Sequence, residues 1–184
     1  VVASAFQVDL ERVKVSATRT DKVPNTSPTA ASSGSDLNGM AALDACEKIL
    51  AGLTEFAAQN WSVSPEAIRF ADNQVQIGDM EMPWETFVQA AYMNRVPLSS
   101  SGFYATPKIH YDPKSGTGRP FLYYSNCAAC SEVVVDTLTG EYRVLRTDIL
   151  FDAGCSLNPD IDIGQIEGGF VQGMGWLTTE ELVY

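Results

Sequence analysis

The sequence is poor in the residue types on which catalytic and metal sites usually depend. Its 184 residues include one histidine, His110, and four cysteines. His110 lies beside Ile109 and Tyr111 with no neighbouring Ser, Cys or Asp pattern, so it supports no nucleophilic triad. Four scattered cysteines are too few for a small secreted disulfide scaffold, which favours a reducing, cytoplasmic location. We therefore assign no catalytic residue and no metal ligand from these residue types.

Basic residues and long apolar runs are also scarce. Twelve Lys and Arg stand against 23 Asp and Glu, a formal net charge of -11, which excludes the clustered positive charge that a nucleic-acid partner needs. The most apolar stretch, 161–176, is interrupted by charged and amide side chains, so the sequence predicts no membrane span. The first residues lack both an initiator Met and the pattern of a signal peptide, and we expect the chain to start within a longer polypeptide.

Two of the cysteines, Cys127 and Cys130, match the C-x-x-C template of redox and zinc sites. Reactive pairs lie at a helix start, whereas these lie in a strand-like run, and no second pair follows at zinc spacing. The pattern favours a structural pair over a redox site. Cys46, among apolar neighbours on a predicted helix, is interpreted as a buried thiol.

Periodicity predicts mixed secondary structure. In the first half it predicts a strand over 12–18, a loop over 24–35, a helix capped by Ser35 or Asp36, and a hairpin of 66–70 with 74–77. The apolar residues of that helix recur every three or four positions, and its other face pairs Asp44 with Lys48. The later elements are a helix from Pro83 to Tyr92, an antiparallel pair over 121–135 and 142–151, a turn at Asn158-Pro159 and a final helix over 161–176. This order predicts an α+β fold with mainly antiparallel strands over 1–184, with a subdivision near 100–120.

The loop before the long helix is a candidate anion site. Residues 29–35 are small and polar, and backbone N–H groups at a helix start form a cradle for an anion when no bulky side chain intervenes. The spacing matches neither the phosphate-binding loop of nucleotide hydrolases nor the dinucleotide fingerprint. From composition alone, a polar surface loop before an ordinary helix remains the favoured alternative.

The final helix is unusually rich in glycine. Each glycine costs a helix interior about 0.8–1.0 kcal/mol relative to Ala, so the cost needs a reason. Gln165, Gly169 and Gln172 share one helical face, where two amides beside bare backbone suit a heterocycle with donors and acceptors. Close packing against another helix is an equal alternative on spacing alone. The five glycines are Gly164, Gly168, Gly169, Gly173 and Gly175.

Several strings together resemble the molybdenum-cofactor-binding region of the xanthine dehydrogenase and aldehyde oxidase family, in its order and spacing. They cover nearly the whole chain, least clearly residues 60–82. The strings are 23–32 (VPNTSPTAAS), 36–39 (DLNG), 129–133 (ACSEV), 145–149 (LRTDI), 156–159 (SLNP), 162–168 (DIGQIEG) and 170–182 (FVQGMGWLTTEEL), the last similar to bacterial members.

The resemblance implies a molybdopterin-binding domain, as a fragment of an enzyme that oxidises hypoxanthine and xanthine to urate with oxygen from water. It implies a molybdenum cofactor here, and iron–sulfur clusters of the 2Fe-2S type, FAD and NAD elsewhere in the parent protein. Gly34 departs from the serine common among relatives, so it offers only backbone there. The residues that match cofactor contacts are Thr29, Ala30, Ala31, Ser32, Ser33, Gly34 and Gln172.

The resemblance also places the catalytic glutamate after Tyr184 and the substrate clamps before Val1, so we expect this chain alone to be inactive. The implied partners are a purine or aldehyde substrate, the rest of the large subunit and the iron–sulfur and FAD parts, in an oligomer. Two alternatives stay open. One is an aldehyde oxidase or another N-heterocycle hydroxylase, and the other is a non-catalytic interaction domain with the same fold.

Overall fold

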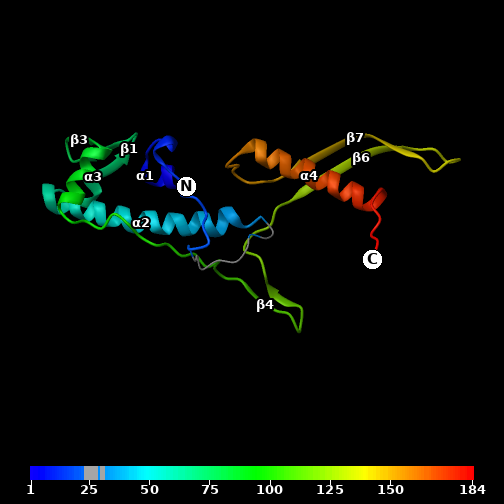
Figure 1. Cartoon of the computed structure of the whole chain (residues 1–184), viewed down its shortest axis with the longest axis horizontal. Coiled ribbons are helices and arrows are strands. Elements are labelled where there is room, and N and C mark those ends of the chain that lie inside the picture. The colour runs from blue at the N-terminus through cyan, green and yellow to red at the C-terminus, as the bar shows by residue number, and fades with distance from the viewer. Residues whose placement is uncertain (23–28, 30–31) are drawn as a thin grey trace. The chain divides into compact units, whose positions relative to one another are not determined.

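The computed structural model describes residues 1–22, 29 and 32–184, which divide into two compact units. Val1–Pro107 contains α1 (Val2–Phe6), η1 (Leu10–Arg12), α2 (Gly34–Trp61), η2 (Pro65–Ala67), β1 (Ile68–Ala71), β2 (Gln74–Ile77), β3 (Met80–Pro83) and α3 (Trp84–Met93). Lys108–Tyr184 contains β4 (His110–Asp112), β5 (Thr117–Arg119), β6 (Cys127–Val135), β7 (Tyr142–Phe151) and α4 (Pro159–Thr178). Helices and antiparallel strands mix in both, which confirms the α+β prediction (Figure 1).

The 28-residue helix α2 is the longest element of the first unit. It starts at Gly34 with Ser33 as N-cap, so the prediction of Ser35 or Asp36 as the cap was wrong. The Ser33 side chain makes no capping hydrogen bond, and the start therefore lacks the side-chain signal on which the prediction depended. The predicted pair of Asp44 with Lys48 is confirmed at 2.7 Å, and Cys46 is buried at 4% exposure, as predicted.

A three-stranded antiparallel sheet packs with α2 and α3. The predicted hairpin is confirmed as β1 and β2, and Asp72 and Asn73 between them both have positive φ (48° and 63°), as a two-residue type I′ turn requires. The sequence did not predict β3, which pairs with β2. Pro83 ends β3 and is the N-cap of α3 rather than a residue of its first turn.

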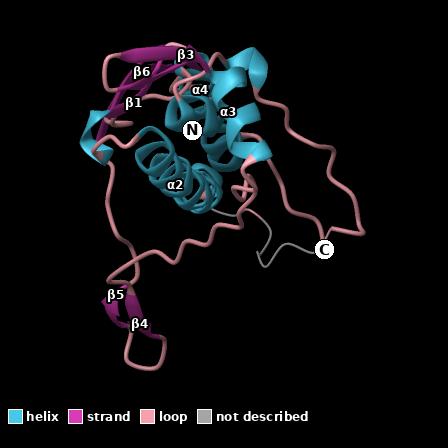
Figure 2. Cartoon of the chain, turned by 90° about the vertical axis from the view of Figure 1, so that its left-hand side faces the viewer, coloured by secondary structure: helices cyan, strands magenta, loops and turns pink. Residues whose placement is uncertain are grey.

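The hydrophobic core lies between α2, the sheet and α3. Phe87, Leu53 and Val75 are its largest fully buried side chains. Aromatic rings pack around Phe87, with ring centroids 6.0 Å from Phe56 and from Phe70. Figure 2 shows α2 nearly end-on with the sheet and α3 on one side of it. The core is therefore built from residues that lie far apart in the sequence.

The predicted strand over 12–18 was wrong. Arg12 ends the short helix η1, the following residues form no regular element, and Val15 is 95% exposed. Alternating polar and apolar residues predict a strand only where a partner strand pairs with them, and no described strand does so here.

The second unit is built around the ribbon of β6 and β7, and the predicted antiparallel pair is confirmed. Its pairing runs from Cys127 opposite Phe151 to Val135 opposite Tyr142, with a register shift after Glu132, and β6 starts later than predicted. The residues of the predicted turn, Asn158 and Pro159, form the start of α4, with Asn158 as its N-cap. Asn158 Oδ1 accepts a 3.3 Å hydrogen bond from the Ile161 N–H, and Pro159 is the first helical residue. None of the residues 108–184, all of which are described, is buried.

Candidate functional site

The loop before α2 is only partly described. Thr29 and Ser32 are exposed and Ser33 is half-buried, whereas Ala30 and Ala31 lie outside the described residues. A Cβ built on Gly34 would be 3.6 Å from Cγ2 of Thr29, an ordinary contact distance. Thr29 therefore lies over the first residue of α2, and the structure leaves room there for the serine that the family resemblance leads us to expect.

The start of α2 has the electrostatics of an anion site. The N–H of Leu37 donates to Ser33 O at 3.0 Å, and the N–H groups before it point out of the helix end by helix geometry. The 28-residue helix adds the positive end of its dipole, although Asp36 in the first turn opposes it. The predicted cradle depends on these backbone N–H groups, and anion binding there stays a prediction.

The glycines of α4 leave one side of the helix bare. Among the described residues, no atom comes within 4 Å of a Cβ built on Gly164, Gly168, Gly169 or Gly173. At Gly175 a described neighbour intervenes, because such a Cβ would lie 2.6 Å from Oε1 of Glu180. Packing within the second unit therefore does not explain the other four glycines.

Gln172 lies in the middle of this bare face. Its side chain is exposed, with Gly168 and Gly169 one turn before it. The half-buried residues Ile166, Phe170 and Met174 recur every four positions on the opposite side of α4. Gln165 shares the face of Gln172, as predicted from the spacing. The face with the amides and glycines also carries exposed Ile161 and Trp176, one turn before Gln165 and one turn after Gln172.

The loop and Gln172 belong to different units, so each is a separate candidate for binding. Other side chains singled out by type do not gather into a site. Cys127 and Cys130 are free, exposed and three residues apart on one strand, which points them to opposite faces of the ribbon. His110 is exposed in β4. In the described part of the chain, no three His, Cys, Asp or Glu side chains are grouped so as to hold a metal ion.

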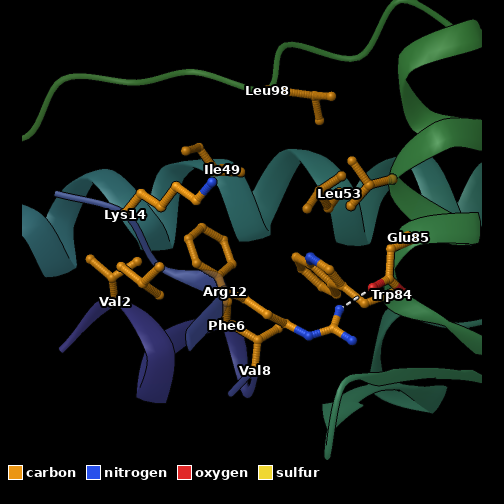
Figure 3. Close-up of a pocket in the computed structure, with 12 residues that line it drawn as sticks. Val2, Phe6, Val8, Arg12, Lys14, Ile49, Leu53, Trp84, Glu85 and Leu98 are labelled. Atoms are coloured by element: carbon orange, nitrogen blue, oxygen red, sulfur yellow. Dashed lines mark hydrogen bonds and ion pairs between the residues drawn. The ribbon is translucent and has the colours of Figure 1, made fainter. Parts of the chain in front are cut away.

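A pocket that the sequence did not indicate opens in the first unit, with a volume of about 630 Å³ (Figure 3). Arg12 and Glu85 form an ion pair beside it, although 73 residues separate them and no local pattern connects them. Trp84 and Leu53 contribute to its apolar wall.

Comparison with known proteins identifies the family of this chain. A family model described as the molybdopterin cofactor-binding domain matches residues 1–184. The chain belongs to this family. Similar curated proteins include a xanthine dehydrogenase of Dictyostelium discoideum, 48% identical over 186 residues, and a xanthine dehydrogenase/oxidase of Felis catus, 47% identical over 184 residues. Both matches cover 100% of this chain, which spans 12% of the length of each relative.

A solved structure supports the fold. The crystal structure of a Cu,Mo-CO dehydrogenase in its carbon monoxide reduced state matches 91% of the chain, and 20% of its own chain is covered. The TM-score is 0.70 at 21% sequence identity, which establishes a shared fold. Among the described residues of the domain, no helix combines the length and hydropathy of a membrane span.

Proposed function

We propose that this molybdopterin-binding domain is part of a molybdenum hydroxylase that oxidises hypoxanthine and xanthine to urate. The similar proteins named xanthine dehydrogenase, matched along the whole chain, support xanthine as the substrate. The cofactor contacts are assigned to Thr29, Ala30, Ala31, Ser32, Ser33, Gly34 and Gln172.

The observation that carries the proposal is the bare face of α4. Four glycines there have no described neighbour, although each costs about 0.8–1.0 kcal/mol of helix propensity. Packing within the second unit therefore does not account for their small size. A planar heterocycle needs both close approach to the backbone and hydrogen-bonding groups, and Gln172 supplies an amide donor and acceptor. The residues present thus fit a pterin.

Each chain segment would have a separate task. The backbone N–H groups at the start of α2 would hold an anionic part of the cofactor, and Gln172 would exchange hydrogen bonds with its ring system. When bound, the cofactor supplies the molybdenum at which substrate is hydroxylated with oxygen from water. No acid or base of this chain is assigned a catalytic role. The 2Fe-2S clusters, FAD and NAD are assigned to other parts of a cytoplasmic, oligomeric parent protein.

Purification of the full-length parent protein tests the proposal. We expect molybdenum and pterin in near-stoichiometric amounts, together with urate formation from xanthine. Molybdenum with aldehyde turnover but no xanthine turnover would keep the cofactor and replace the substrate. A folded parent protein without molybdenum or pterin would refute the proposal and favour an interaction domain.

A further inference from the structure

The pocket in the first unit is distinct from the proposed cofactor loop. Ile49, which lines the pocket, lies 15 residues after the first residue of α2, or about 22 Å along the helix at 1.5 Å per residue. None of Thr29, Ser32 or Gly34 lines the pocket. A ligand of this pocket would therefore be a second ligand rather than an extension of the first.

The pocket wall is mainly apolar. Leu53 is only 1% exposed and connects the pocket to the hydrophobic core, whereas the outer wall comes from α1, α3 and the segments that flank them. An apolar pocket of several hundred Å³ with a few polar groups is typical of a binding site. The apolar lining residues are Val2, Phe6, Val8, Val13, Ile49, Leu53, Trp84, Val88 and Leu98.

Three charged residues lie in this apolar wall: Arg12, Lys14 and Glu85. Arg12 pairs with Glu85, so these two charges offset each other. The Lys14 ammonium forms no ion pair or hydrogen bond with any described residue, and Figure 3 shows that it projects from the same segment as Arg12. The pocket thus has an excess of one positive charge in a chain whose net charge is -11. A complementary occupant is apolar and brings one carboxylate.

We infer that this pocket receives an apolar segment of the parent polypeptide, from outside this chain, whose Asp or Glu pairs with Lys14. The inference depends on the proposed function in one respect, because it takes the chain to be part of a longer enzyme. Each curated relative reported above is matched over only 12% of its length, so most of such a polypeptide lies outside the chain. A polypeptide segment is therefore favoured over a small amphiphilic acid, which the test separates.

The reactivity of Lys14 distinguishes these occupants. The full-length parent protein and the 184-residue chain are treated with a limiting amine-acetylating reagent, and the modification at each lysine is followed by peptide mass spectrometry. A neighbouring carboxylate favours the charged, unreactive ammonium, so we expect Lys14 to react about tenfold more slowly in the parent protein than in the chain. Lys48 is the internal control, because its partner Asp44 lies in both proteins and its rate should agree between them.

Removal of small molecules provides the second arm. The folded parent protein is dialysed exhaustively before acetylation, so that a reversibly bound small acid is removed, and Lys14 protection should persist. Protection that is lost after this treatment, or equal Lys14 rates in both proteins at matched Lys48 rates, would overturn the inference. Metal content does not enter this measurement. If Lys14 is protected in a parent protein that contains no molybdenum, the proposed function is refuted and the inference about the pocket stands.

A third arm needs only the parent protein. Lys14→Glu places like charges together in the pocket and should lower its thermal midpoint. Lys114→Glu makes the same change of net charge in an exposed turn of the second unit, with no side-chain partner among the described residues, and should have little effect. Equal midpoints for the two variants would contradict the inference.

Discussion

The carboxylate of Asp44 in α2 accepts a 2.9 Å hydrogen bond from the backbone N–H of Phe103, 59 residues further along the chain. Lys48 donates to the same carboxylate at 2.7 Å and to the carbonyl of Ser101 at 3.3 Å. This pair of side chains, one turn apart on α2, therefore holds the extended segment that follows α3 against the helix.

The hydrogen bond from Lys48, followed by that from Phe103, lowers the pKa of Asp44 below its usual value. A lowered pKa in the folded state means that the stabilisation is fully present above the unfolded-state pKa and is lost as pH falls through the folded-state value. We expect Asp44→Asn to lower the thermal midpoint at neutral pH, by an amount that shrinks as the solution is acidified below the ordinary Asp pKa. Thermal unfolding of both proteins at several pH values measures this.

Asp79→Asn is the matched control for that experiment. Asp79 is exposed in the turn between β2 and β3 and makes no side-chain hydrogen bond or ion pair among the described residues, so the same change of charge should leave the midpoint nearly unchanged. If both variants lose the same stability, net charge rather than the contact with Phe103 is responsible.

Gly102 lies so close to α2 that no side chain fits. A Cβ built there would be 1.8 Å from Ala41 O and 2.7 Å from Ala45 N, both backbone atoms that cannot move aside. We expect Gly102→Ala to destabilise the first unit by about 1–3 kcal/mol, the usual cost of overpacking. Chemical denaturation followed by tryptophan fluorescence measures the change, because Trp61 and Trp84 both belong to this unit.

Gly52→Ala provides a control of opposite sign. Gly52 is a residue of α2 itself, and no atom of the described residues lies within 4 Å of a Cβ built on it. Alanine there should stabilise by up to about 1 kcal/mol through helix propensity. A Gly102→Ala protein as stable as Gly52→Ala would mean that the segment does not lie against α2 in solution.

The four cysteines should react with thiol reagents in two classes. Burial raises the pKa of the Cys46 thiol, whereas Cys127, Cys130 and Cys155 are exposed. Because the thiolate is the reactive form, we expect alkylation of three cysteines in the native protein and of Cys46 only after unfolding. Peptide mass spectrometry locates the modified residues. Rapid labelling of Cys46 in the folded chain would contradict the packing of α2.

The role of Gln172 is tested in the full-length parent protein. Gln172→Leu keeps volume and helix propensity but leaves polar atoms of a bound pterin unpaired, at about 1–3 kcal/mol for each unsatisfied group. We expect the molybdenum content per folded protein to fall. Gln165→Leu, on the same face of α4, should have a smaller effect, and thermal stability is measured in parallel to detect unfolding. Unchanged molybdenum content in Gln172→Leu would remove this residue from the cofactor site.

Local patterns in the sequence were sufficient for elements that a few adjacent residues determine. The hairpin at Asp72-Asn73, the pairing of β6 with β7, the buried position of Cys46 and the pair of Asp44 with Lys48 all follow from turn preference or periodicity within one element. The family membership was also predicted from strings of the sequence, and a family model that matches residues 1–184 confirms it.

Tertiary structure alone decided the features that depend on distant partners. Residues 12–18 alternate like a strand, yet they form none, since no described strand pairs with them. The ion pair of Arg12 with Glu85, the contact of Asp44 with Phe103 and the close approach of Gly102 to α2 each join residues more than 50 positions apart. Local propensity does not predict such contacts, because their free energy arises only when packing brings the two segments together.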